Sequence, residues 1–307
     1  MQKVIRIGTR ESQLAVWQAE QVKQYISHQG FETALVYIKS EGDLDLKTPL
    51  YEMGVQGIFT RSLDMALLEH RIDIAVHSMK DVPTQLAEGI YQAAVLPRGP
   101  VHDLLVFRTD GAFLTEPDYI ANVATSSIRR KAQWLHRYPN HRIHNLRGNI
   151  NTRLHKLSSG SWDAAIFAQA GLERINLRPA TSVILDWMLP APAQGAIMVV
   201  CRKEDEYARQ ACEQFNDADT AVCTRIERDF LRTLLGGCST PISALAEIKH
   251  GIVYFKGNLF SVNGSEKAEI ERQAAVHEAE GLGYAAALEL LNKGGKEIAD
   301  RIEHAVT

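Results

Sequence analysis

Two residue patterns occur twice in this 307-residue chain, in the same order, and they restrict its fold more than any other feature. The first pattern, at residues 7–15 and 122–135, runs from a short apolar stretch through a Thr/Ser turn into an amphipathic segment, which predicts a strand, a turn and a helix. The second pattern, Ile-Asp-Ile-Ala-Val-His-Ser at 72–78 and Trp-Asp-Ala-Ala-Ile-Phe-Ala at 162–168, predicts a strand buried in a parallel sheet. The repetition predicts two similar α/β domains that face each other across a cleft.

Polar residues follow the first of these buried strands directly. We expect the strand to cover Ile72–Val76 and to stop before Pro83, which lacks a backbone donor. In an open α/β sheet, the carboxyl end of a strand opens onto the crevice where ligands bind. Asp81 is therefore the residue that we expect to carry chemistry, and a solvated strand exit is the alternative interpretation. The other polar residues in this stretch are His77, Ser78 and Lys80.

Two proline-rich passages, at residues 97–100 and 186–192, indicate where the chain crosses between the two α/β domains. The strand predicted at Ala196–Arg202 is expected to return to the first domain, which gives a hinge with two crossings. Ser40–Gln56 is a long connection rich in glycine and acidic residues. Loops of such length in a compact domain are often lids, so a lid over residues 40–57 is expected.

The end of the chain predicts a separate small α+β domain. Its expected elements are a helix over Ala221–Leu235, strands over Ile252–Leu259 and Ala268–Val276, and a helix over Gly283–Leu291. Asn263 and Gly264 mark the turn between the two strands. The predicted domains are residues 1–98 with 196–217, residues 99–195, and residues 218–307.

Five arginines stand near predicted strand ends or helix starts: Arg10, Arg129, Arg130, Arg147 and Arg153. Helix N-termini favour anions, and arginine grips a carboxylate or phosphate through two parallel hydrogen bonds. Gly148 would let a ligand approach the backbone beside Arg147. The pattern predicts a ligand with several carboxylates or phosphates, without separating the two. The alternative is that each arginine is a surface residue or forms an ion pair.

The charge and the apolar patterning exclude several classes of partner. A net charge of −3 provides no basic field for nucleic acid or anionic membranes. No stretch approaches the ~20 apolar residues of a membrane helix, and the chain enters a strand at once without a signal sequence. We expect a cytoplasmic protein, and a monomer, because no exposed apolar stripe is evident.

The four cysteines form no C-x-x-C pair, so neither a metal site nor a disulfide framework is predicted. Cys238 follows two glycines in a loop where a sulfur could be exposed. Such a thiol could act as a nucleophile or anchor a covalent group, whereas a lone cysteine is more often simply buried.

Taken together, these residues resemble the porphobilinogen deaminase family, also called hydroxymethylbilane synthases. The similar motifs come in the family's order and span nearly the whole chain. They are residues 8–15, 73–83, 125–130, 146–149 and 152–154, Gln194 with Gly195, and Gly236 to Cys238 with Pro241.

The resemblance implies two periplasmic-binding-protein-like, doubly wound α/β domains and a small C-terminal α+β domain. It implies that Cys238 carries a dipyrromethane cofactor through a thioether. Four porphobilinogen molecules would be joined head to tail with loss of ammonia, and hydroxymethylbilane released by water. Asp81 matches the catalytic aspartate, which would pass protons and steady the positive charge on the substrate.

The resemblance also assigns the binding residues, since each pyrrole carries an acetate and a propionate. The implied cofactor-binding residues are Cys238, Ser78, Lys80, Asp81, Thr125, Ser126, Ser127, Arg129, Arg130, Arg147 and Gly148. The implied substrate-binding residues are Arg10, Ser12, Arg147, Arg153 and Gln194.

Three segments depart from the family's usual pattern. Gln56 stands where a basic residue is usual in the lid, and Ser239 replaces a frequent glutamine. Pro192 and Ala193 replace a more flexible Val-Gly in the second crossing. Two rival functions are a noncatalytic, two-lobed anion-binding protein and a phosphate-binding transferase that uses the same arginines.

Overall fold

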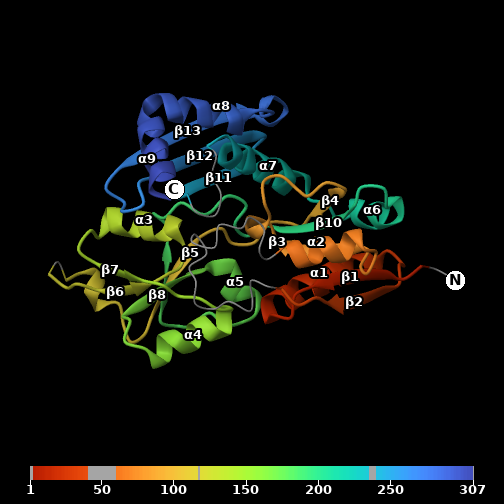
Figure 1. The fold of residues 1–307 in the computed structure, drawn as a ribbon, viewed down its shortest axis with the longest axis horizontal. Helices are drawn as coiled ribbons and strands as arrows, with labels where there is room; N and C mark the ends of the chain where they lie inside the picture. The colour runs from red at the N-terminus through yellow and green to blue at the C-terminus, as the bar shows by residue number, and fades with distance from the viewer. Residues whose placement is uncertain (1–2, 41–59, 117, 235–239, 307) are drawn as a thin grey trace. The chain divides into compact units, whose positions relative to one another are not determined.

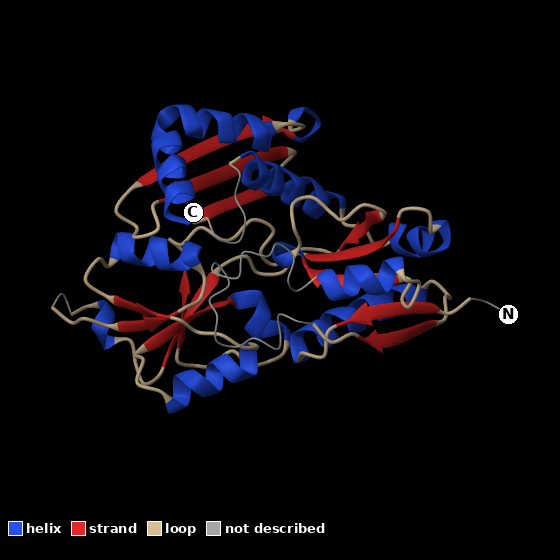
Figure 2. Ribbon diagram, in the orientation of Figure 1, coloured by secondary structure: helices blue, strands red, loops and turns tan. Residues whose placement is uncertain are grey.

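The computed structural model describes residues 3–40, 60–116, 118–234 and 240–306 (Figures 1 and 2). The predicted lid and Cys238, Ser239 and Gln56 lie outside these ranges. The described chain forms two compact units. The first unit contains residues 3–40, 60–99 and 194–222, and the second unit contains the remainder.

The first unit is built on a five-stranded sheet with the order β2-β1-β3-β10-β4. Its strands are β1 (Ile5–Thr9), β2 (Thr33–Tyr37), β3 (Ile74–Ser78), β4 (Ile90–Val95) and β10 (Ile197–Arg202). β1 runs parallel to β2 and β3, whereas β10 runs antiparallel to β3 and β4. The predicted return of the chain to the first sheet is therefore confirmed. Its helices are α1 (Gln13–His28), α2 (Arg61–Leu68) and α6 (Glu206–Glu213).

The second unit contains a sheet of the same design, with the order β7-β6-β8-β5-β9. Its strands are β5 (Asp103–Phe107), β6 (Asn122–Ala124), β7 (Arg142–His144), β8 (Ala164–Ala168) and β9 (Ser182–Leu185). β6 is parallel to β7 and β8, and β5 is the antiparallel strand. The helices that follow these strands are α3 (Ile128–Arg137), α4 (Ile150–Ser159) and α5 (Gln169–Arg174).

The repeated aspartates of the sequence pattern have the same structural role in both sheets. Asp73 accepts a hydrogen bond from the backbone nitrogen of Arg6 at 2.9 Å and donates its own backbone N–H to the Arg6 carbonyl at 2.8 Å. Asp163 makes the equivalent pair with Asn122, at 2.7 and 2.9 Å. Each aspartate therefore ties two parallel strands together where they start. The predicted fold class, two doubly wound α/β sheets and a small α+β part, is confirmed.

The second unit also contains the C-terminal α+β part, a three-stranded antiparallel sheet with the order β11-β12-β13. Its elements are α7 (Ala218–Thr233), which belongs to this unit from Cys223 onwards, β11 (Ile242–Lys249), β12 (Ile252–Phe260), β13 (Lys267–Ala275), α8 (Leu282–Leu290) and α9 (Lys296–Val306). Phe230 of α7 packs on Phe255 of β12, with ring centroids 5.2 Å apart. Gly257 is required below them, because a Cβ there would lie 2.6 Å from the Phe230 ring.

A buried glutamate ties this sheet to the second crossing of the chain. Glu227 of α7 accepts hydrogen bonds from the backbone nitrogens of Ala193, at 2.6 Å, and of Ala246 on β11, at 2.7 Å. Ala193 has a positive φ of 60°, which is unusual for a residue other than glycine. The carboxylate therefore holds the crossing segment in a conformation that the sequence alone does not favour.

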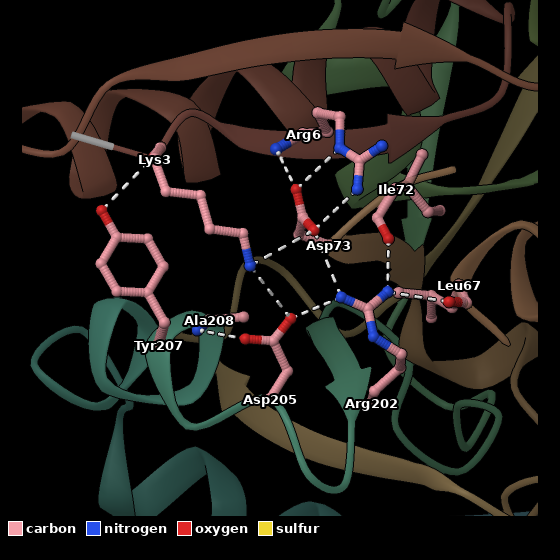
Figure 3. A network of polar contacts seen from close by, with 9 residues as sticks. All are labelled: Lys3, Arg6, Leu67, Ile72, Asp73, Arg202, Asp205, Tyr207 and Ala208. Atoms are coloured by element: carbon pink, nitrogen blue, oxygen red, sulfur yellow. Dashed lines mark hydrogen bonds and ion pairs between the residues drawn. The ribbon is translucent and has the colours of Figure 1, made fainter. Parts of the chain in front are cut away.

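A network of charged side chains lies at one end of the first sheet (Figure 3). At this end β3 starts, whereas at the other end β3 leads into residues 79–83. Arg202, at the end of β10, donates to the carbonyls of Leu67 at 2.8 Å and Ile72 at 2.6 Å. It also pairs with Asp73 at 3.2 Å and with Asp205. The Arg202 side chain is almost fully buried, so it joins α2, β3 and β10 in a place that water does not reach.

Among the described residues, no helix is long and apolar enough to cross a membrane.

Candidate functional site

The turn that carries Asp81 is fixed by the backbone on both sides. β3 runs on through Ser78, two residues further than predicted, because β10 pairs with His77 and Ser78. A single 3₁₀ turn, η2 (Met79–Asp81), follows. The Met79 nitrogen donates to the Ala196 carbonyl at 3.0 Å, and the Met79 side chain is buried. Asp81 therefore stands on a turn that is anchored to β10.

The two residues before Asp81 in the predicted site are each held by a glutamine. Gln18 of α1 is buried and donates from Nε2 to the Ser78 hydroxyl at 2.9 Å. The Lys80 ammonium donates to Oε1 of Gln194 at 3.2 Å. Gln194 is 0% exposed, and its carbonyl accepts from the Arg98 guanidinium at 2.9 Å. The structure thus brings Ser78, Lys80 and Gln194 together around η2.

The Asp81 side chain is half-buried, and among the described residues its carboxyl group makes no hydrogen bond or ion pair. By contrast, two structural carboxylates, those of Asp73 and Asp103, are engaged by arginines. A carboxylate on a fixed turn without such a partner is available to a ligand and can exchange protons with it.

Arg10 and Ser12 occupy the predicted turn between β1 and α1. Ser12 caps α1 by accepting from the Ala15 nitrogen at 3.4 Å, so the free amides of the first helical turn begin here. Arg10 follows β1 directly, and the β1–β3 register places it beside His77. Burial, together with the charge of Arg10, lowers the pKa of His77 to about 3. His77 is therefore a neutral imidazole, and Arg10 supplies the positive charge.

In the second unit, Arg129 and Arg130 share one buried carboxylate. Asp103 of β5 accepts from Nη2 of Arg129 and from Nη2 of Arg130, each at 2.7 Å. Arg129 also donates to the Leu189 carbonyl at 2.8 Å, and Arg130 to the Ile166 carbonyl at 3.1 Å. The alternative of an ion pair is therefore observed for these two arginines: two guanidinium groups face one carboxylate, which leaves a net charge of one positive unit. That this charge binds an anion stays a prediction.

Burial of Asp103 would by itself raise its pKa, but the charges and hydrogen bonds of Arg129 and Arg130 hold the pKa well below the usual range. Burial lowers the pKa of Arg129, against the attraction of Asp103. The ionised form of Asp103 is consequently favoured, and the two arginines are held in fixed positions. The Nε of Arg130 is buried and has no hydrogen-bond partner within the described residues.

The loop before Arg147 is bound to the turn before α3. The Ser126 hydroxyl donates to the Leu146 carbonyl and accepts from the Leu146 nitrogen at 3.1 Å. The Thr125 hydroxyl accepts from the Ser127 nitrogen at 3.2 Å, and Ser127 caps α3 by accepting from the Arg130 nitrogen at 3.4 Å. The predicted residues from the α3 turn and the Arg147 loop are therefore brought together.

Gly148 has a φ of +115°, and a Cβ there would lie 2.8 Å from the Thr152 methyl group. Only glycine fits this position without strain. Arg153 donates to the Gly148 carbonyl at 2.6 Å, and Lys156 donates to the Arg147 carbonyl at 3.1 Å. Two further cations of α4 thus border the loop, of which Lys156 was not predicted.

The predicted site residues fall into two groups, one in each unit. Those of the first unit are Arg10, Ser12, Ser78, Lys80, Asp81 and Gln194. Those of the second unit are Thr125, Ser126, Ser127, Arg129, Arg130, Arg147, Gly148 and Arg153. Cys238 lies outside the described residues.

Sequence reasoning missed several residues that hold the site in place, namely Gln18, Asp103 and Gln133. One signal was present in the repeat, because Gln18 and Gln133 each stand six residues after the serine that caps its helix. A buried glutamine on the inner face of an amphipathic helix is a polar residue that needs partners. Asp103 gave no such signal, since its partners are distant in the sequence.

Two sheets of the same strand order, each with one antiparallel strand, define a protein of the doubly wound α/β class, here with an added α+β part. Similar solved structures include the periplasmic VFT2 domain of Bordetella pertussis BvgS, with a TM-score of 0.43 and 13% identity, covering 69% of this chain and 86% of that one. Another is the substrate-binding protein AbpA of an amino acid ABC transporter from Streptococcus pneumoniae, with a TM-score of 0.40 and 15% identity, covering 69% and 86%.

Sequence comparison is more specific than this likeness of fold. A family model described as "Porphobilinogen deaminase, dipyromethane cofactor binding domain" matches residues 5–210, and one described as "Porphobilinogen deaminase, C-terminal domain" matches residues 221–292. A porphobilinogen deaminase from Syntrophotalea carbinolica is 41% identical over 302 residues, which is 97% of this chain and 94% of that protein. The chain belongs to the porphobilinogen deaminase family.

The residues of the second unit fit the dipyrromethane cofactor that this family carries. The cofactor bears acetate and propionate groups, and carboxylates are favoured at the N-terminus of α3, where two guanidinium groups leave one uncompensated charge. The buried Nε of Arg130, which has no hydrogen-bond partner among the described residues, suits a bound carboxylate.

Proposed function

We propose that this chain catalyses the head-to-tail joining of four porphobilinogen molecules, with release of ammonia, to give hydroxymethylbilane. The family match over nearly the whole chain supports this function. The structural observation that carries it is the Asp81 carboxyl group, which stands on an anchored turn and has no partner among the described residues.

Asp81 acts as the proton carrier of the reaction. It gives a proton to the leaving amine of porphobilinogen, stabilises the positive charge that remains on the substrate, and accepts the proton lost from the pyrrole carbon. The neutral imidazole of His77 adds no charge beside it. A single carboxyl group can perform these steps in turn, because the proton that it gives to the leaving amine is replaced by the proton that it accepts from the pyrrole carbon.

Cys238 is proposed to hold the dipyrromethane cofactor, which serves as the primer that is extended. The residues proposed to bind it are Ser78, Lys80, Asp81, Thr125, Ser126, Ser127, Arg129, Arg130, Arg147 and Gly148. Arg10, Ser12, Arg147, Arg153 and Gln194 bind the carboxylates of the incoming substrate. Gln194 acts through Lys80 as well, since the two side chains are hydrogen-bonded.

We further propose three domains, comprising residues 1–98 with 196–217, 99–195, and 218–307. The protein is proposed to act as a cytoplasmic monomer, without nucleic-acid or membrane partners. The net charge of −3 supports the absence of an electrostatic attraction to nucleic acid. A noncatalytic anion-binding protein is not favoured, because binding alone requires no proton carrier such as Asp81.

Intact-mass measurement tests the proposal most directly. Protein made in a cell that synthesises porphobilinogen should carry the extra mass of two linked pyrroles, localised to the peptide that contains Cys238. An assay of ammonia released from porphobilinogen should show turnover. An unmodified thiol at Cys238 together with no ammonia release would refute the proposed function and favour a binding protein.

A further inference from the structure

One segment of the second unit is rich in positive charge and contains no acidic residue. Residues 119–162, which cover β6, α3, β7 and α4, include eight lysines and arginines and no aspartate or glutamate, whereas the whole chain has 37 acidic and 34 basic residues. The eight cations are Arg129, Arg130, Lys131, Arg137, Arg142, Arg147, Arg153 and Lys156. Asp103, from outside the segment, pairs with Arg129 and Arg130. The segment therefore carries an excess of positive charge in a chain whose net charge is −3.

Three of these cations lie around the loop between β7 and α4. Lys156 donates from Nζ to the Arg147 carbonyl at 3.1 Å, and Arg153 donates from Nε to the next carbonyl, that of Gly148, at 2.6 Å. Arg153 and Lys156 are three residues apart on α4, so their positive charges repel each other. An anion bound beside this loop would reduce the repulsion.

Lys156 has the contacts expected of an anion-binding residue. Its bond to the Arg147 carbonyl uses one of the three N–H groups of the ammonium. Within the part of the chain that the structure describes, Lys156 forms no ion pair, and its side chain is half-buried. A carbonyl is a neutral acceptor, so this bond does not compensate the positive charge, and two donors remain for a ligand.

We propose that Lys156 is a further substrate-binding residue, which holds a carboxylate of porphobilinogen together with Arg147 and Arg153. This inference rests on the proposed function, in which these two arginines bind the substrate. Porphobilinogen carries an acetate and a propionate, and a carboxylate can accept from an ammonium and a guanidinium at once. The bond to the Arg147 carbonyl already holds Nζ beside the loop, so little side-chain freedom is lost when the carboxylate binds.

A binding role and a structural role for Lys156 differ in their dependence on salt. Ions screen the attraction between Lys156 and a carboxylate, because the Debye length falls from ~30 Å at ~0.01 M to ~3 Å at ~1 M ionic strength. If Lys156 only held the Arg147 carbonyl in place, its contribution would depend much less on salt. An interaction made equally with substrate and transition state changes KM and leaves kcat nearly unchanged.

The experiment compares Lys156→Met, which removes the ammonium and keeps the length of the apolar stem, with Lys156→Arg, which keeps the charge. KM and kcat are measured by ammonia release, and loaded protein is counted by intact mass. Lys156→Met should raise the KM for porphobilinogen about threefold to tenfold at low ionic strength and leave kcat nearly unchanged. The increase should fall below about twofold at high ionic strength. Lys156→Arg should keep the KM near the wild-type value at both.

Arg142→Met is the matched control. Arg142 is an exposed cation of the same acid-free segment, but it lies at the start of β7, whereas the loop with Arg147 follows the end of that strand. Its removal should leave KM unchanged. Binding is also measured without turnover, since porphobilinogen should raise the melting temperature of Asp81→Asn protein by less when Lys156→Met is added.

An equal rise in KM at low and high ionic strength would show that Lys156 only holds the loop, and this result or a wild-type KM in Lys156→Met would overturn the inference. Lys156→Gln removes the same charge and decides the matter if Lys156→Met does not fold. A wild-type protein without the added mass of two pyrroles and without ammonia release would refute the proposed function, and this inference with it. Failure of the inference alone leaves wild-type turnover intact, so the two failures are distinguishable.

Discussion

Asp81 and His77 lie four residues apart in the sequence, but His77 is buried and Asp81 is partly exposed. His77 is buried inside β3 beside Arg10, whereas Asp81 stands on the turn that follows and keeps part of its surface exposed. Burial without a counter-charge keeps the imidazole neutral. The Asp81 carboxyl group has no arginine bound to it among the described residues and is therefore available to a ligand.

Replacing the Asp81 carboxyl group should lower turnover and leave folding unchanged. Asp81→Asn keeps the size of the side chain and breaks no hydrogen bond or ion pair among the described residues, so the variant should fold with a wild-type melting temperature. Its kcat for ammonia release should fall about 10²- to 10⁴-fold, the usual contribution of a proton-transferring group. Asp219→Asn, an exposed aspartate of the same unit, is the matched control. Near-normal turnover in Asp81→Asn would remove Asp81 from the mechanism.

His77 should make the protein sensitive to acid. Its folded pKa of about 3 lies below the unfolded value of 6.5, so the unfolded state binds a proton more readily. The stabilising contribution is present above pH 6.5 and is lost as the pH falls from 6.5 towards 3. His77→Gln has no such proton to bind, and its free energy of unfolding should decline less between pH 6.5 and pH 4. Urea titrations at several pH values measure this; parallel declines in both proteins would contradict it.

At the scale of the element, the sequence predicted the repeated strand–turn–helix units because their apolar periodicity is carried by neighbouring residues. It placed the end of β3 too early, since only the pairing with β10, more than a hundred residues away, extends the strand to Ser78. β11 was not predicted, because Ala244 and Ala246 have little strand preference of their own. That strand forms through pairing along its whole length with β12.

In the candidate site, too, features that depend on neighbouring residues were predicted, and features that depend on distant residues were not. Ser12 and Ser127 were placed correctly at helix starts, which depend on local sequence alone. The pairing of Arg129 and Arg130 with Asp103 and the bond between Lys80 and Gln194 join residues separated by at least 26 positions. Such pairs leave no local pattern in a single sequence.

Arg202 should be essential for the stability of the elements that it joins. Arg202→Met would leave the Leu67 and Ile72 carbonyls without this donor and remove a buried positive charge from beside Asp73 and Asp205. Breaking such a buried network typically costs about 3–5 kcal/mol. The control Arg71→Met breaks only the exposed ion pair with Glu69 and should cost under about 1 kcal/mol. Equal losses in urea-induced unfolding would show that the network contributes no more than a surface pair.

At the scale of the whole molecule, the first sheet is assembled from two distant parts of the chain. β10 lies between β3 and β4, and all of its residues are buried. Residues 1–99 alone therefore lack an internal strand and one partner for each of its neighbours. The first unit is therefore compact in the structure, although its residues are not continuous in the sequence.

A fragment of residues 1–99 should consequently fail to fold cooperatively. The same fragment joined by a flexible linker to residues 194–222 regains β10 and α6, and should show dispersed amide NMR signals and a single unfolding transition. The linked form with Val199→Asp, which buries a charge in the restored strand, is the control and should remain unfolded. Cooperative unfolding of residues 1–99 alone would contradict the prediction.

The late arrival of β10 also has a consequence for synthesis on the ribosome. About 100 residues separate the end of β4 from the start of β10, and at the usual speed of translation they take roughly 5–20 s to appear. Throughout that interval β3 and β4 have emerged with unpaired edges and apolar faces. A nascent chain in this condition is a natural client for chaperones, and its yield in the cell should depend on how long the ribosome takes to deliver one strand.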